Sequence, residues 1–172
     1  MIKIETEKQL LTAIRVLTGF FILALIASGS TAFPLETELS IICGMLEGST
    51  GVLGELHSWF ASIYEGVSYT NAHYPFIMYG CDWLAFAHIM IAVAFLGVFF
   101  KPVRNIWIVY FGMIACISVI PTILICGAVR DIPFFWQIVD SSFGIFGIIP
   151  LLILRHYIKK LAKVSGYVEQ KY

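Results

Sequence analysis

The sequence predicts an all-α, polytopic membrane protein with four transmembrane helices and an amphipathic helical lid on the outer side. Of its 172 residues, 59% are hydrophobic and only 13% are charged, whereas soluble domains contain about 25% charged residues. The mean hydropathy is +0.88. Four apolar stretches are long enough to cross roughly 30 Å of hydrocarbon. We therefore expect one four-span transmembrane domain over residues 1–172.

The predicted spans cover about residues 14–33, 76–100, 106–129 and 133–158. Short turns at 101–105 and 130–132 make the last three helices antiparallel neighbours. The small residues "SGSTA" at 28–32 resemble a signal-peptide cleavage site, but the preceding segment is long and carries Glu5 and Glu7. We therefore expect an uncleaved first span.

Basic residues predict the orientation. All but Arg130 of the 11 Lys and Arg residues fall on one side of the predicted topology: Lys3, Lys8, Arg15, Lys101, Arg104, Arg155, Lys159, Lys160, Lys163 and Lys171. Because loops rich in Lys and Arg face the cytoplasm, the topology is predicted to be N-in and C-in. The chain has no basic tract or nucleic-acid motif, so we expect a lipid bilayer and no nucleic acid as partner.

The outer loop, residues 34–75, is too long to be a structureless connection. Apolar residues recur at helical spacing from about 52 to 67, which predicts an amphipathic helix. A shorter helix at about 36–46 precedes it, and Pro75 suits the start of the second span. This helical loop either covers helix ends only or forms a lid over an outward-facing pocket.

Two acids and one histidine lie well inside predicted spans, away from the span ends: Asp82, Asp140 and His88. Such groups face protein or water rather than lipid, and they are functional candidates. Helical rise places Asp82 and Asp140 roughly 9 and 12 Å along their helices, at similar depth. The predicted ligand-binding residues are Asp82, His88, Asp140, Arg130, Tyr79, Trp83, His57 and Ser141.

Structural interpretations of the same residues stay open. Asp82 or Asp140 pairs with Arg130 in an architectural ion pair, or His88 is a neutral histidine bonded to a carbonyl or hydroxyl. Asp131 precedes the fourth span and is expected to cap it. The glycines of "DSSFGIFG", Gly144 and Gly147, predict close helix packing.

Metal chemistry is the main alternative for these side chains. Asp82, His88 and Asp140 are the candidate metal ligands, but no HExxH or similar spacing is present. Haem held by two histidines would need a second histidine well inside a span, and the sequence has only His88 there. The sequence also gives no specific indication that His88 binds a quinone. No CxxC motif supports thiol redox chemistry. Cys43, Cys81 and Cys126 are either free thiols or include one structural disulfide. The sequence thus names no cofactor.

The segments "YPFIMYGCDWLAFAHIMIA", "PVRNIWIVYFGMIAC" and "RDIPFFWQIVDSSFGIFGIIPL" resemble an uncharacterised family of bacterial four-helix integral membrane proteins with a YGxDWLAFAH segment. The resemblance covers roughly residues 74–151 and implies a bacterial inner membrane, with no known activity. Cys81 departs from the Thr expected there, which argues against a redox role for that thiol.

These observations favour a membrane protein that binds a small or lipidic ligand, or a partner subunit, through an outward-facing polar pocket. One alternative is a membrane enzyme that uses Asp82, His88 and Asp140 as metal ligands or as acid and base groups. Another is an accessory subunit of a larger membrane complex. A proton relay through the same residues would require a homo-oligomer, because four spans are few for a transporter.

Overall fold

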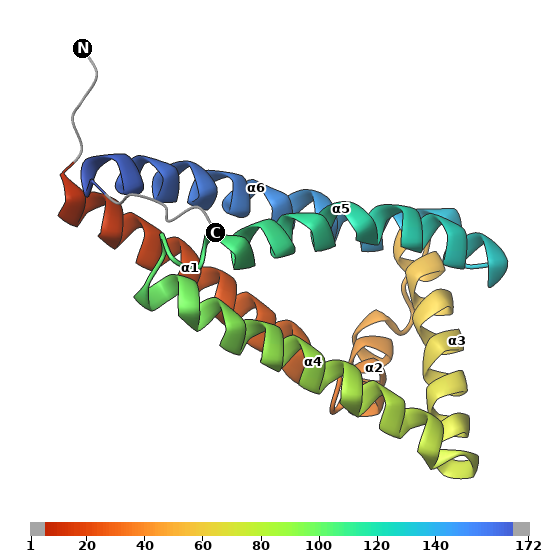
Figure 1. The fold of residues 1–172 in the computed structure, drawn as a ribbon. Coiled ribbons are helices and arrows are strands. Elements are labelled where there is room, and N and C mark those ends of the chain that lie inside the picture. The colour runs from red at the N-terminus through yellow and green to blue at the C-terminus, as the bar shows by residue number, and fades with distance from the viewer. Residues whose placement is uncertain (1–5, 167–172) are drawn as a thin grey trace. The chain divides into compact units, whose positions relative to one another are not determined.

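The computed structural model describes residues 6–166, and within them the chain forms six helices and no strand (Figure 1). The all-α fold class is confirmed. The helices are α1 (Glu7–Thr31), α2 (Leu35–Leu46), α3 (Val52–His73), α4 (Pro75–Phe100), α5 (Ile106–Val129) and α6 (Phe134–Val164). Lys3 and Lys171, which entered the orientation prediction, and Glu5, which entered the signal-peptide argument, lie outside the described residues.

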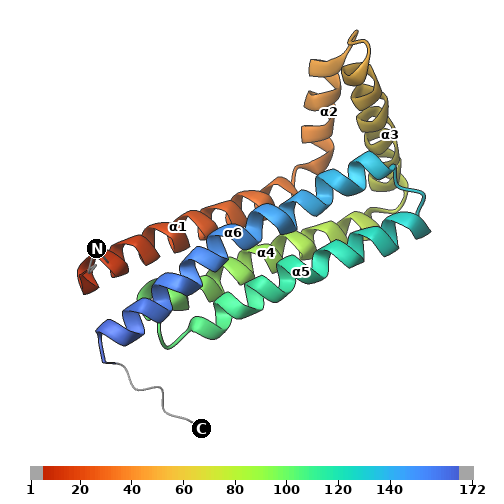
Figure 2. The ribbon, with the colours of Figure 1, turned by 90° about the horizontal axis from the view of Figure 1, so that it is seen from above.

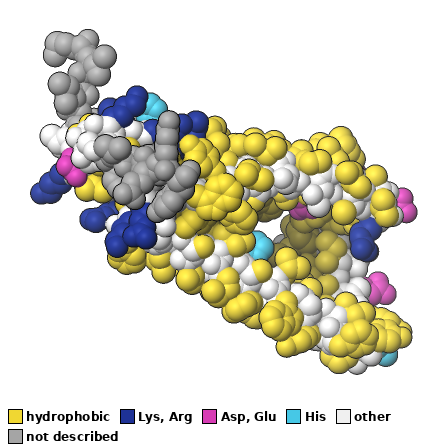
Figure 3. Space-filling view, viewed as in Figure 1, with side chains coloured by type: hydrophobic (Ala, Val, Ile, Leu, Met, Phe, Trp, Pro, Cys, Tyr) yellow, Lys and Arg dark blue, Asp and Glu magenta, His cyan; other side chains and the backbone are white. Residues whose placement is uncertain are grey.

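Helices α1, α4, α5 and α6 are long and apolar enough to cross a membrane, which confirms the four predicted spans. Large apolar side chains are exposed along them, as on α5, where Phe111 and Ile117 face outward. Figure 3 shows such side chains over much of the visible surface of these helices. An apolar exterior of this kind is stable against lipid chains and costly in water.

Several helices extend beyond the predicted bounds. Helix α1 begins at Glu7 rather than at 14, α3 continues to His73 rather than 67, and α6 continues to Val164 rather than 158. Hydropathy marks where apolar residues begin and end, whereas the backbone stays helical through polar residues until a breaker intervenes. For α3 that breaker is Pro75, which has no N–H to donate.

The chain divides into two compact units. Of the described residues, unit 1 comprises 6–22 and 93–166, and unit 2 comprises 23–92. Unit 1 therefore contains the first part of α1, the end of α4, and all of α5 and α6. Unit 2 contains the end of α1, the α2–α3 segment and the first part of α4.

Unit 1 has a core to which four helices contribute. Its fully buried side chains are Leu10, Ile14 and Thr18 from α1, Phe95 and Val98 from α4, Val109 from α5, and Leu151, Leu154 and Ile158 from α6. The Phe95 ring lies 4.7 Å from the Phe21 ring, centroid to centroid. A Cβ added to Gly112 would lie 3.1 Å from both Phe95 and Leu151, so α5 supplies a glycine where these side chains need room.

The α5–α6 turn corrects one sequence interpretation. The Ile132 N–H donates to the Gly127 carbonyl at 2.9 Å, and Asp131 has a left-handed φ of 54°. This is the six-to-one bond of a Schellman motif, in which the residue after the helix end is left-handed. Asp131 therefore ends α5 and does not cap α6, whose N-cap is Pro133 without a side-chain bond. The predicted cap is wrong.

Candidate functional site

Helices α2 and α3 form a helical hairpin in unit 2 (Figure 2). Leu39 is its buried apolar residue on α2. The connection needs two residues with positive φ, and glycine supplies both, with 74° at Gly48 and 63° at Gly51. Glycine adopts this conformation at no steric cost. The two helices predicted in the outer loop, at about 36–46 and 52–67, are confirmed.

A hydrogen bond joins the start of α2 to the end of α3. The Asn71 side-chain N–H donates to a Glu36 carboxylate oxygen at 2.7 Å. Hydrogen bonds from Asn71 and then Ser68 lower the pKa of Glu36 below its ordinary value of 4.5, because they favour the ionised carboxylate. This bond places a negative charge where the hairpin meets the ends of α1 and α4.

Acid is expected to weaken the hairpin. A carboxylate whose pKa is lower in the folded state stabilises that state above its unfolded pKa, and this contribution is lost as pH falls from about 4.5 through the folded value. We expect the thermal midpoint of the full-length protein to fall over this range, and to fall less in Asn71→Ala and Glu36→Gln. Glu38→Gln removes a carboxylate from the same helix turn and should keep the wild-type pH profile. Equal profiles in all four proteins would contradict the assignment.

Helices α1 and α4 approach closely within unit 2 at Gly29. A Cβ added there would lie 2.8 Å from the Cβ of His88 and 2.9 Å from the carbonyl oxygen of Ala85, which is fully buried. Only glycine fits this contact without movement of a helix. The contact fixes the end of α1, from which Ala32 and Phe33 continue toward the start of α2.

A cavity of about 360 Å³ lies in unit 2 where α1, α2, α3 and α4 begin or end. Its polar side chains are Glu36, Asn71, Tyr79, Cys81 and Asp82, and its apolar residues are Ala32, Phe33, Leu35, Pro75 and Met78. The volume is within the range of small-molecule sites, roughly 300–1,000 Å³. No Lys, Arg or His is among the lining residues, so the cavity contains two acids and no base.

Asp82 also lines a second, mainly apolar pocket of about 210 Å³ with Tyr79, Trp83 and Phe86. The three rings are arranged edge to face, with centroids 6.0 Å apart for Tyr79–Trp83 and 5.9 Å apart for Trp83–Phe86. This geometry is favourable for aromatic pairs. Asp82 therefore lines both the polar cavity and the aromatic pocket.

The predicted site residues separate into groups. Asp82 and Tyr79 line the polar cavity, and Trp83 is beside them in the aromatic pocket. His88 lines neither of these two pockets, and its Nδ1 lies 3.0 Å from the Leu84 carbonyl oxygen. His57 is half-buried on α3 and is also absent from both linings. Arg130, Asp140 and Ser141 belong to unit 1. That Asp82 and Asp140 converge on one site, and that one of them pairs with Arg130, stay predictions.

Two polar residues of the cavity were missed by sequence reasoning. The sequence pattern singles out neither Glu36 nor Asn71. They are 35 positions apart, and their bond depends on how the hairpin closes. The usable signal was weak: Asn71 lies one helical turn before Pro75, and Glu36 lies two residues after Pro34, at the two ends of one helical loop.

No three His, Cys, Asp or Glu side chains gather to hold a metal ion within residues 6–166. The metal alternative with Asp82, His88 and Asp140 stays a prediction, because its ligands are divided between the two units. The four cysteines, all in the described part of the chain, are free thiols. Comparison with known proteins finds no matching family model, no similar curated protein and no similar solved structure.

Proposed function

We propose that this multi-pass membrane protein binds a small ligand carrying a positive charge in the polar cavity of unit 2. The observation that carries the proposal is the pair of carboxylates, Glu36 and Asp82, from two different helices in one cavity of about 360 Å³ without a basic lining residue. A cationic group offsets such paired negative charge, and charge-assisted hydrogen bonds are the strong ones.

The rest of the lining favours an organic cation over a bare ion. Phe33 and Tyr79 present aromatic side chains to the cavity, and aromatic faces attract ammonium groups. Met78 and Leu35 add apolar surface. A free amine and the amine headgroup of a lipid share this chemistry, which agrees with a small or lipidic ligand.

The setting of the site completes the proposal. The basic residues favour an N-in, C-in topology, which puts the α2–α3 hairpin outside the cytoplasm. In a bacterial inner membrane, as the YGxDWLAFAH resemblance implies, the hairpin is a periplasmic lid. Its ends, at Glu36 and Asn71, border the cavity.

A matched pair of probes tests the proposal. Benzylammonium and benzyl alcohol have similar size and differ in charge. We expect benzylammonium to raise the thermal midpoint of the purified full-length protein, and benzyl alcohol to have little effect at equal ionic strength. Phosphatidylethanolamine, compared with phosphatidylcholine, tests the lipid source of the amine.

Charge removal should weaken this binding. Hydrogen bonds to charged groups are worth about 1.5–3 kcal/mol, so Asp82→Asn and Glu36→Gln are each expected to weaken benzylammonium binding by about 10- to 100-fold. Glu38→Gln, two residues from Glu36 and absent from the lining, is the control and should bind normally. The proposal fails if no cationic probe stabilises the protein, or if Asp82→Asn binds as wild type does.

A further inference from the structure

Three basic residues form a stripe on the second half of α6. Arg155, Lys159 and Lys163 follow one another at a spacing of four residues, which places them on one face of the helix. Like charges at this spacing destabilise a helix in isolation. A bound anion would offset the repulsion.

A cavity of about 330 Å³ in unit 1 lies beside this stripe. Lys159 and Lys163 line it from α6, Tyr110 and Ile106 line it from α5, and Val103 lines it from the turn before α5. No Asp or Glu is among the lining residues. The cavity therefore combines two ammonium groups with apolar side chains.

Arg155 adds positive charge next to the cavity. Its guanidinium carbon lies 5.5 Å from the centre of the Tyr110 ring. Its Nε is buried and has no hydrogen-bond partner among the described residues. A buried donor without a partner is costly, and the arrangement concentrates positive charge around Tyr110.

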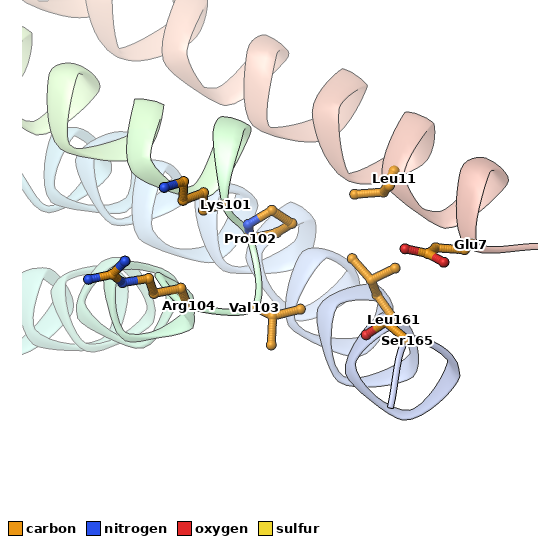
Figure 4. A pocket seen from close by; sticks show the side chains of 8 residues that line it. All are labelled: Glu7, Leu11, Lys101, Pro102, Val103, Arg104, Leu161 and Ser165. Carbon is orange, nitrogen blue, oxygen red and sulfur yellow. The ribbon is translucent and has the colours of Figure 1, made fainter. Parts of the chain in front are cut away.

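A neighbouring cavity of about 380 Å³ has a different character (Figure 4). Glu7 is among its lining residues, together with Leu11 and Leu161. Figure 4 shows the charged ends of Lys101 and Arg104 pointing away from Glu7. The two cavities share Val103, but the cavity beside the α6 stripe has no acidic lining residue, whereas this one has Glu7.

We propose that the cavity of Tyr110, Lys159 and Lys163 binds the phosphate group of an anionic phospholipid. The lysines supply the charge for a phosphate, and Val103 and Ile106 supply apolar surface where the acyl chains begin. The site is at the start of α5, a helix long and apolar enough to span a membrane, and Trp107 in its first turn is 66% exposed. Basic pockets between membrane-spanning helices on the cytoplasmic side recognise anionic headgroups.

The test uses the full-length protein in a neutral detergent. Phosphatidylglycerol is expected to raise the thermal midpoint, and phosphatidylcholine with the same acyl chains is not. Each Lys near a membrane surface contributes about 1 kcal/mol, so Lys159→Gln with Lys163→Gln should weaken phosphatidylglycerol binding about 30-fold. The control, Lys8→Gln with Lys101→Gln, removes equal charge without changing a residue that lines this cavity.

Inorganic phosphate at matched ionic strength separates the two sources of the anion. If phosphate does not shift the thermal midpoint, the site is assigned to the lipid. If phosphate raises the midpoint of the wild-type protein but not of the Lys159→Gln, Lys163→Gln variant, the site is assigned to free phosphate. Equal weakening in both double variants, or equal stabilisation by the two lipids, would overturn the site. If the double variant does not fold, Lys159→Gln alone should weaken phosphatidylglycerol binding about 5-fold, and added NaCl should weaken binding to the wild-type protein. Salt-independent binding, or unchanged binding in Lys159→Gln, overturns the proposal.

Discussion

Gly144→Ala is expected to lower the stability of the α5–α6 pair by about 2 kcal/mol. A Cβ at this position would lie 2.6 Å from the Cys116 carbonyl oxygen and 2.7 Å from a methyl carbon of Val119. The carbonyl belongs to the helix backbone and cannot move without α5. Alanine favours the helix over glycine by about 1 kcal/mol. The measured loss of stability is therefore the cost of the steric clash minus this gain in helix propensity.

Gly147→Ala is the matched control for this prediction. It lies three residues further along α6, and its added Cβ would meet the Cys116 sulfur at 3.1 Å. A thiol can rotate, so this variant should keep wild-type stability or gain slightly. Unfolding in mixed detergent micelles, followed by circular dichroism, measures both. A Gly144→Ala protein that unfolds no earlier than Gly147→Ala would show that the two helices do not need this close contact.

Close helix packing at Gly144 could be predicted from the sequence, because glycine within a span usually marks a site where two helices pack closely. In lipid, helices gain little from burying apolar surface against each other, and association depends on close packing. The same reasoning did not predict the close contact of α1 with α4 at Gly29. Its neighbours at 28–32 were compared with a cleavage site, and nothing local indicates that His88 and Ala85 of another helix lie against it.

The spans were predictable because each crossing requires an apolar stretch of about 20 residues, whatever its neighbours are. The site was predictable only in part for the opposite reason. Asp82 was found because an acid inside a span is rare. Glu36 is in a polar loop, where acids are ordinary, and it enters the cavity only through the fold of the α2–α3 hairpin. Depth along a helix placed Asp82 and Asp140 at one level but could not say which helix faces meet.

Gly29→Leu is expected to separate the ends of α1 and α4 in unit 2, at a cost of about 3 kcal/mol. Even the first carbon of the new side chain would lie 2.8 Å from the Cβ of His88 and 2.9 Å from the Ala85 carbonyl oxygen. The backbone of α4 cannot yield there without shifting Cys81 and Asp82, one turn away. Binding of benzylammonium in the polar cavity should therefore be lost along with stability.

Gly80→Leu makes the same change on α4, where an added Cβ would meet nothing within 4 Å. Thermal unfolding should leave Gly80→Leu near wild type and Gly29→Leu well below it. If Gly29→Leu were as stable as Gly80→Leu, α1 and α4 would not be in contact at His88. If it were unstable but bound the cation normally, the cavity would not depend on that contact.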